Sequence, residues 1–334
     1  MLAQFPHDKR DFRIQAHSAI LAPTPLDNKF YQTYDWLIAG AMEVRLQKQA
    51  LARRKFDQIR EVTEAEVEFF EENGWVKLDG LFAPPLANEL LQHITKVMET
   101  RIKGEDGYVA ERAPDAQGAL MVEYVASTNL RESDSWLEDL AVCHEMAEAS
   151  ARLIKTRPLR LFADSVFHKP KRGDGEAWFS GETPWHQDYP ATPLDRANDL
   201  QIWVAACEIT PDMGCLQYMS GSHRLPPMGK ATAYRDANGK MYPKGAVEVY
   251  PWLLEKFEVS PAFHMQPGDA LAHHSLTMHY SQENQSTKFD RWAWGSRRMD
   301  ARVCYNGAPN HRTDGRGLQL DKPFDHPAFP IVIE

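Results

Sequence analysis

Along the first half of the chain, apolar residues recur every three or four positions among charged ones, as on one face of an α-helix. One helix has a clear start and end, because Thr63 and Glu66 have the spacing of a capping box and Gly74 follows. Another begins at Pro84 and Pro85, since proline favours the first turn of a helix. The pattern predicts helices over 33–62, 64–73, from 84 onward and over 136–154.

After Pro158 the pattern changes to short apolar runs that are separated by glycine, proline, asparagine and aspartate. Such runs are typical of strands joined by turns. Helices followed by strands predict an α+β chain whose second half is a sandwich or jelly roll. The strands are expected at 75–82 (with a turn), 159–167, 200–209, 215–219, 262–265, 270–272 and 297–305.

The composition of the 334 residues, with 43% hydrophobic and 25% charged, is typical of a soluble globular protein. No apolar stretch is long enough to span a membrane, and the first residues do not resemble a secretion signal. A net charge of -9 disfavours nucleic-acid binding. The four cysteines form no C-x-x-C pair, which predicts reduced thiols in a cytoplasmic protein.

A metal-binding pattern occurs at His186-Gln187-Asp188. Residues two apart on a strand point to the same side, so one imidazole and one carboxylate can meet at a single point. Two histidines and one carboxylate form the ligand set of non-haem Fe(II) oxygenases. The pair alone also fits a surface histidine beside a solvated aspartate. His273, His274 and His279 are candidates for the third ligand, and periodicity does not choose among them.

Arg297 and Arg298 precede an apolar run, Val303-Cys304-Tyr305. An arginine on an inner strand is costly unless an anion pairs with it, and the planar guanidinium suits a carboxylate. The alternative is a pair of surface arginines.

Several motifs in sequence order resemble the phytanoyl-CoA dioxygenase family of Fe(II)/2-oxoglutarate oxygenases. The resemblance covers about residues 63–305. It rests on the opening segment 69–82, Lys169-Pro170, His186-Gln187-Asp188, Trp203, the segment 213–223 and Pro267-Gly268-Asp269. It implies a double-stranded β-helix core (jelly roll, cupin-like) flanked by N-terminal helices. The domains are then an arm and helix at 1–62, the dioxygenase domain at 63–305 and a tail at 306–334.

The resemblance also implies roles for individual residues. His186, Asp188 and His279 would bind Fe(II), while His273 and His274 would be packing or pocket residues. Arg297 would hold the distal carboxylate of 2-oxoglutarate, with Arg298 as the alternative. Residues 288–295 look like an insertion that delays this arginine, which makes Arg291 a third candidate. Three residues match positions that line the cosubstrate in relatives: Gln187, Trp203 and Ser281.

The implied activity is oxidation of a small apolar metabolite with molecular oxygen, most simply its hydroxylation, with release of succinate and CO2. Asp188 fills a position that is Gly or Ala in related halogenases, which disfavours halogenation. Segment 171–182 is expected to form a lid at the substrate cavity. Five aromatic residues near the motifs are either pocket or core: Trp178, Phe179, Trp185, Trp292 and Trp294.

Two rival functions remain: a non-catalytic jelly-roll binding protein, and a cupin-type metalloenzyme that does not use 2-oxoglutarate. No nucleic-acid or membrane partner is expected. The N-terminal helix has apolar positions on more than one side, which predicts a homodimer formed through it.

Overall fold

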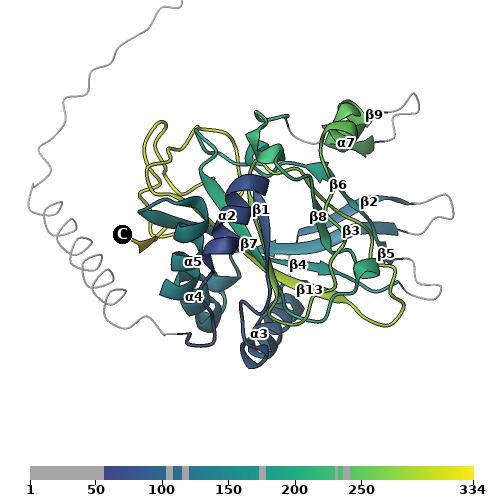
Figure 1. Ribbon diagram of the computed structural model, residues 1–334, viewed down its shortest axis with the longest axis horizontal. Helices are drawn as coiled ribbons and strands as arrows, with labels where there is room; N and C mark the ends of the chain where they lie inside the picture. The colour runs from purple at the N-terminus through teal and green to yellow at the C-terminus, as the bar shows by residue number, and fades with distance from the viewer. Residues whose placement is uncertain (1–55, 103–107, 115–119, 173–177, 230–231, 236–240) are drawn as a thin grey trace, which may run out of the picture. The chain divides into compact units, whose positions relative to one another are not determined.

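Antiparallel strands form the framework of the computed structural model, and they curl into sheets accompanied by few helices (Figure 1). The structure describes residues 56–102, 108–114, 120–172, 178–229, 232–235 and 241–334. The bounds and contacts given below refer to these residues, which belong to one compact unit.

The larger sheet joins strands from distant parts of the chain. Within the described residues its order is β1 (Trp75–Leu78), β11 (Ala270–His274), β7 (Asp199–Ala205), β13 (Arg291–Asp300), β4 (Leu159–Lys169), β3 (Leu120–Thr128) and β2 (Tyr108–Pro114). Two short strands add to it: β14 (Ile331–Ile333) pairs antiparallel with β4, and β5 (Trp178–Ser180) pairs parallel with β3.

A smaller sheet has the order β6 (Thr183–His186), β12 (His279–Ser281) and β8 (Leu216–Tyr218), and β9 (Thr232–Arg235) pairs with β10 (Met241–Lys244). The pairing of β6 with β12 places His186 directly opposite His279. Curled antiparallel sheets of this kind are the architecture of a jelly roll, so the predicted fold is confirmed.

The helices lie mainly in the first half of the described chain, as the apolar spacing predicts. They are α2 (Glu64–Asn73), α3 (Pro84–Ile102), α4 (Ser135–Val142), α5 (His144–Ile154), α6 (Ala246–Val249) and α7 (Trp252–Lys256). Single 3-10 turns occur at η1 (Leu130–Glu132), η2 (Tyr189–Ala191), η3 (Pro211–Met213) and η4 (Ser222–Arg224). The predicted capping box is present at the start of α2, where Thr63 and Glu66 each accept a hydrogen bond from the other's backbone N–H.

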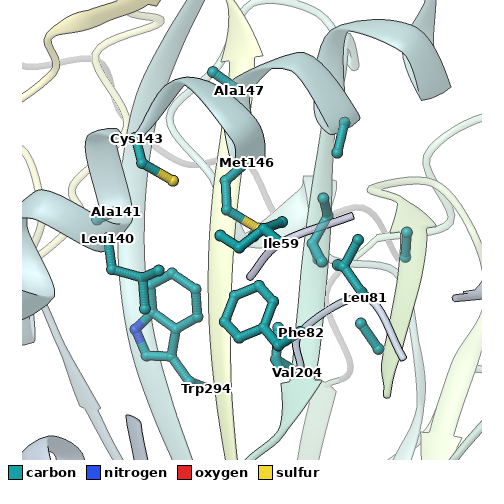
Figure 2. Close-up of a cluster of buried hydrophobic side chains, with 14 of the residues drawn as sticks. Ile59, Leu81, Phe82, Leu140, Ala141, Cys143, Met146, Ala147, Val204 and Trp294 are labelled. Carbon is teal, nitrogen blue, oxygen red and sulfur yellow. The ribbon is translucent and has the colours of Figure 1, made fainter. Parts of the chain in front are cut away.

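A large apolar core lies between the larger sheet and the helices (Figure 2). In this core Trp294 of β13 and Val204 of β7 meet side chains of α4 and α5, among them Leu140 and Met146. Successive residues of a strand point to opposite faces. Ala293, next to Trp294, accordingly packs in a second cluster with Trp203.

The predicted helix over 136–154 is wrong in one respect, because Cys143 divides it. Cys143 has an extended backbone (φ -63°, ψ 151°) and separates α4 from α5. The break leaves carbonyl groups at the end of α4 without helical partners. The buried Arg298 donates to one of them, the carbonyl of Ala141, at 2.7 Å.

Two strand predictions are also corrected. The last long strand, predicted over 297–305, runs from Arg291 to Asp300; residues 291–295 pair with β4, and residues 293–295 also pair with β7. These five residues are therefore part of the sheet, which contradicts an insertion over 288–295. The strand predicted at 262–265 is reduced to a single bridge between Met265 and Ile209.

Residues on both sides of the predicted domain, 63–305, are part of the described structure. Residues 56–62, predicted as the end of a helix, form a turn and a bridge between Ile59 and Phe82, and Phe56 and Val62 are buried in the main core. Residues 33–55, on which the predicted homodimer depends, lie outside the described residues. The tail 306–334 is largely irregular apart from β14.

All four cysteines are free, in agreement with the predicted thiols. Among the described residues, none of the helices has the length and apolar character that crossing a membrane requires.

Candidate active site

Three predicted metal ligands come together at the end of the smaller sheet. His186 is the last residue of β6, Asp188 follows two positions later, and His279 opens β12. Their ligand atoms all lie within 4.8 Å of one another. The Nε2 atoms of His186 and His279 are 3.7 and 3.8 Å from the same oxygen, Oδ1 of Asp188. The structure thus makes one cluster of the side chains proposed from sequence.

The hydrogen bonds of the two imidazoles suit metal binding. Nδ1 of His186 lies 2.7 Å from the carbonyl of Pro184, and Nδ1 of His279 lies 2.9 Å from the carbonyl of Thr277. A carbonyl only accepts, so each Nδ1 carries the proton and each Nε2 presents a lone pair. Fixing the remote nitrogen in this way orients a metal-bound histidine. The donor set fits Fe(II).

The surroundings of the cluster favour an ionised Asp188 carboxylate and a neutral His279 imidazole. Burial by itself would raise the pKa of Asp188, but the Arg297 guanidinium and the hydrogen bond from His273 hold that pKa well below its usual range. Burial, together with His186 and His273, lowers the pKa of His279 well below its usual value. Both groups are therefore in the protonation state that a divalent cation requires.

The three side chains of the cluster differ in exposure. Those of His186 and Asp188 are 24% and 19% exposed, whereas that of His279 is only 5% exposed. Solvent therefore reaches the cluster at His186 and Asp188.

The first candidate arginine, Arg297, contacts two carboxylates. Its Nε donates to Asp199 at 2.6 Å, and its Nη1 lies 3.6 Å from Oδ2 of Asp188. Arg297 thus lies beside the metal ligands on the site-facing side of β13.

The second candidate, Arg298, lies on the other side of the same strand. It donates to the hydroxyl of Ser296 and to the carbonyl of Ala141 in α4, and it is fully buried. Arg298 therefore faces the helices, and the structure does not bring it to the site.

The third candidate, Arg291, begins β13 on the same face as Arg297. Its guanidinium carbon is 5.3 Å from the ring centre of Trp203, and its Nη1 donates to the carbonyl of Gly214 at 3.1 Å. Ser281 donates to that same carbonyl at 2.8 Å. Since Ser281 is two residues after His279 on β12, Arg291 is linked through Gly214 to the strand of a metal ligand.

Several other predicted site residues contact loop backbone or apolar side chains rather than the metal cluster. The side-chain amide of Gln187 bonds backbone groups of Leu276, Pro226 and Met228. Trp294 belongs to the core under the helices, and Trp292 stacks on His168 with ring centres 3.8 Å apart. Trp185 packs with Met219, Leu253 and Met278. Within the predicted lid, 171–182, residues 173–177 lie outside the described part. The backbone of β5 is described, but the side chains of Trp178 and Phe179 are not.

Sequence reasoning gave no site role to three buried polar residues around the cluster, Lys169, Asp199 and Tyr218, whereas His273, predicted as a packing or pocket residue, is also buried there. Lys169 donates to the carbonyls of Gly181, Ser281 and Gln282. His273 lies between Tyr218 and Asp188. For Tyr218 and His273, the only signal in the sequence is a polar residue at an alternating position of an otherwise apolar strand.

Known proteins share this architecture. The carbocyclase SnoK from nogalamycin biosynthesis, described as non-heme and alpha-ketoglutarate-dependent, superposes with a TM-score of 0.65 at 21% identity over 80% of this chain and 96% of SnoK. The epimerase SnoN, in complex with Fe3+, alpha-ketoglutarate and nogalamycin RO, gives 0.62 at 21% identity over 80% and 98%. EctD from S. alaskensis, with 2-oxoglutarate and 5-hydroxyectoine, gives 0.55 at 17% identity over 72% and 77%.

At these identities the three likenesses show a common fold. No curated protein sequence matches the chain. The family model of phytanoyl-CoA dioxygenase (PhyH), by contrast, matches residues 70–293.

The jelly roll and the His–Asp–His cluster together define an iron- and 2-oxoglutarate-dependent oxygenase. The chain belongs to the phytanoyl-CoA dioxygenase family, and its cofactors are iron and 2-oxoglutarate.

Proposed function

We propose that this enzyme hydroxylates a small apolar metabolite and releases succinate and CO2, with His186, Asp188 and His279 as its iron ligands. The observation that carries the proposal is the meeting of these three side chains, within 4.8 Å, at a partly exposed point of the jelly roll. When bound there, iron and 2-oxoglutarate supply the oxidising chemistry that acts on the substrate with molecular oxygen.

Arg291 is proposed to bind the distal carboxylate of 2-oxoglutarate, in preference to Arg297 and Arg298. A dicarboxylate that chelates iron at one end needs a cation some distance away at the other. Arg297 already contacts the metal-ligating carboxylate itself, and Arg298 faces the helices. Arg291 lies on the same side of β13 as Arg297, and its guanidinium contacts the ring of Trp203 and the carbonyl of Gly214 rather than a metal-ligating carboxylate.

Trp203 and Ser281 are proposed to flank the cosubstrate. Both lie next to Arg291, Trp203 under its guanidinium and Ser281 on the shared carbonyl of Gly214. Gln187 is proposed to act at the cosubstrate only indirectly, because its amide already joins the segment after β6 to two other loops.

Hydroxylation is proposed because Asp188 is present and ionised, so the third protein ligand position is filled and no halide needs to bind there. SnoK is described as a carbocyclase and SnoN as an epimerase, so this fold supports more than one outcome. The apolar character of the substrate is proposed from the sequence, because Trp185, Met219 and Met278 pack with one another in a buried cluster.

The proposal is tested with purified protein, Fe(II), 2-oxoglutarate and oxygen, measuring succinate in the presence of a panel of small apolar compounds. Substrate-dependent succinate is expected from the wild type and none from Asp188→Ala. Succinate formation that is equal in Asp188→Ala would contradict the assigned site.

The same preparation separates the rivals. A non-catalytic binding protein would bind no iron at this cluster. A cupin-type metalloenzyme of another class would bind metal but would not bind an unreactive oxoglutarate analogue with a dependence on Arg291.

We also propose that the protein is cytoplasmic and forms a homodimer through its N-terminal region. The four free cysteines suit a reducing compartment. Light scattering of the full chain and of a chain lacking residues 1–55 tests the dimer, since the core contacts of Phe56 and Val62 are then retained. The same number of chains per particle in both proteins would count against it.

A further inference from the structure

We propose that His273 is a positioning residue for the metal-ligating carboxylate. Together with Tyr218 behind it and Arg297 beside it, His273 holds the oxygen of Asp188 that does not face the two histidine ligands. This inference rests on the proposed iron site at His186, Asp188 and His279, and it assigns His273 a role beyond packing.

The two oxygens of Asp188 have different surroundings. Oδ1 faces the Nε2 atoms of His186 and His279 at 3.7 and 3.8 Å. Oδ2 faces Nε2 of His273 at 3.4 Å and Nη1 of Arg297 at 3.6 Å. One oxygen is therefore directed to the metal position and the other to the larger sheet.

His273 is fixed from behind by a tyrosine. The hydroxyl of Tyr218 lies 3.1 Å from Nδ1 of His273, and both side chains are fully buried. If the hydroxyl donates to Nδ1, then Nε2 carries the proton of the neutral ring and donates to Oδ2 of Asp188. The ring of Tyr218 is itself stacked on Trp75, with centres 5.1 Å apart, which ties the chain of hydrogen bonds to β1.

Arg297 is fixed in a similar way on the other side of Oδ2. Its Nε donates to Asp199, a fully buried carboxylate on β7, at 2.6 Å. The hydroxyl of Ser275 bonds the second oxygen of Asp199. The larger sheet thus supplies one hydrogen bond, from His273, and one ion pair, from Arg297, to the same oxygen of Asp188, which follows β6 of the smaller sheet.

The consequence is a carboxylate that binds metal through Oδ1 alone. A carboxylate free to rotate can bind through both oxygens and occupy a further coordination position. Holding Oδ2 by the hydrogen bond from His273 and the ion pair with Arg297 would leave that position open to the cosubstrates. Partners of this kind orient a metal ligand, and their loss commonly weakens metal binding 10- to 100-fold.

His274 provides a matched control. It is adjacent to His273 on β11, where neighbouring side chains point to opposite faces. Its Nδ1 accepts a hydrogen bond from the backbone N–H of Leu276, and it lies beside His223 rather than Asp188.

The test uses Co(II) as the probe with the full chain, measuring its dissociation constant and the visible absorption of the bound ion, which reports coordination geometry. His273→Phe is expected to weaken Co(II) binding about 10- to 100-fold and to change the spectrum at saturation. Tyr218→Phe should act in the same direction to a smaller extent. His274→Phe should retain wild-type affinity and spectrum. Thermal unfolding of each metal-free variant is measured as well, to establish that the variant is folded.

Wild-type affinity and spectrum in His273→Phe would overturn the positioning role, as would an equal effect in His274→Phe. If His273→Phe does not fold, Tyr218→Phe decides by the same two readouts. A His186→Ala variant separates this failure from that of the proposed function. If His186→Ala still binds Co(II), the proposed iron site itself is contradicted. If His186→Ala loses Co(II) binding while His273→Phe binds as the wild type does, only the positioning role is contradicted.

Discussion

The two faces of the larger sheet carry opposite chemistry, and adjacent residues of one strand show it most clearly. On β13, Arg297 reaches two carboxylates beside the metal cluster, whereas Arg298 reaches a serine hydroxyl and a helix-end carbonyl. The same contrast separates His273 from His274 on β11. Strand alternation, and not residue type, decides which side chain takes part in the site.

Neighbouring strands extend this division across the sheet. His273 pairs with Gln201 and Gln201 with Arg297, so three polar side chains form one row on the site-facing side. The opposite face carries Val204 and Trp294 under the helices. We therefore expect substitutions on one face to change mainly the free energy of unfolding, and substitutions on the other to change mainly the proposed binding of iron and 2-oxoglutarate.

The largest expected effect is on the helix-facing side. Trp294→Ala removes a fully buried ring and should lower the free energy of unfolding by about 3–5 kcal/mol. Denaturant unfolding measures this value. In the fraction that stays folded, the affinity for Co(II) should be that of the wild type, and a large loss of affinity would show that the two faces are not separable.

The next effect is a pH dependence from Asp164, which also lies on the helix-facing side. Burial raises the pKa of Asp164 to about 6, although Arg131 opposes the shift, whereas the unfolded value is near 3.8. The folded state then binds its proton more tightly, so stability falls as pH rises from about 4 to 6, by up to about 3 kcal/mol.

The side chain in Asp164→Asn cannot ionise, so the variant does not lose stability as the pH rises from about 4 to 6. Its stability relative to the wild type should therefore increase between pH 4 and 6 and level off above. Chemical unfolding at several pH values measures the difference, and a difference that is constant with pH would contradict the buried, ionisable Asp164.

The third effect distinguishes the two arginines of the site-facing side. Arg291→Leu should raise the dissociation constant for 2-oxoglutarate about 100-fold, or about 2.7 kcal/mol, with metal affinity little changed. Arg297→Leu should instead weaken metal binding. If Arg297→Leu weakened 2-oxoglutarate binding and Arg291→Leu weakened metal binding, Arg297 and not Arg291 would be the residue that binds 2-oxoglutarate.

The smallest effect is expected from Arg298→Met. Burial lowers the pKa of Arg298 to about 10, and its hydrogen-bond partners are neutral. Removing a buried charge offsets the loss of the bond to Ala141, so the free energy of unfolding should change by no more than about 1 kcal/mol. Binding of 2-oxoglutarate should be unaffected, and calorimetry checks both values.

Local signals in the sequence predicted much of this structure. The capping box at Thr63 and Glu66 involves residues three apart, and the His186–Asp188 pair involves residues two apart. The capping box forms as predicted, but β6 ends at His186 and Asp188 has a helical backbone (φ -73°, ψ -39°), so the two ligands meet without the strand alternation on which the prediction rested. The jelly roll followed from repeated strand and turn signals together with the family resemblance.

Features that depend on distant contacts were not predictable in the same way. Neither glycine nor proline marks the break at Cys143, where Arg298 of a distant strand completes the end of α4. The start of β13 at Arg291 is fixed by its pairing with Lys169, far away in the sequence. The contact of His273 with Asp188 joins two different sheets.

The central claim is that His186, Asp188 and His279 hold iron with positions left open for 2-oxoglutarate. The most direct measurement is an anaerobic titration of 2-oxoglutarate into the Fe(II)-loaded protein, followed by the visible charge-transfer absorption of the chelated ion. We predict a band that saturates at one equivalent per chain and is lost in His279→Ala. No band in the wild type, or an equal band in His279→Ala, would contradict the claim.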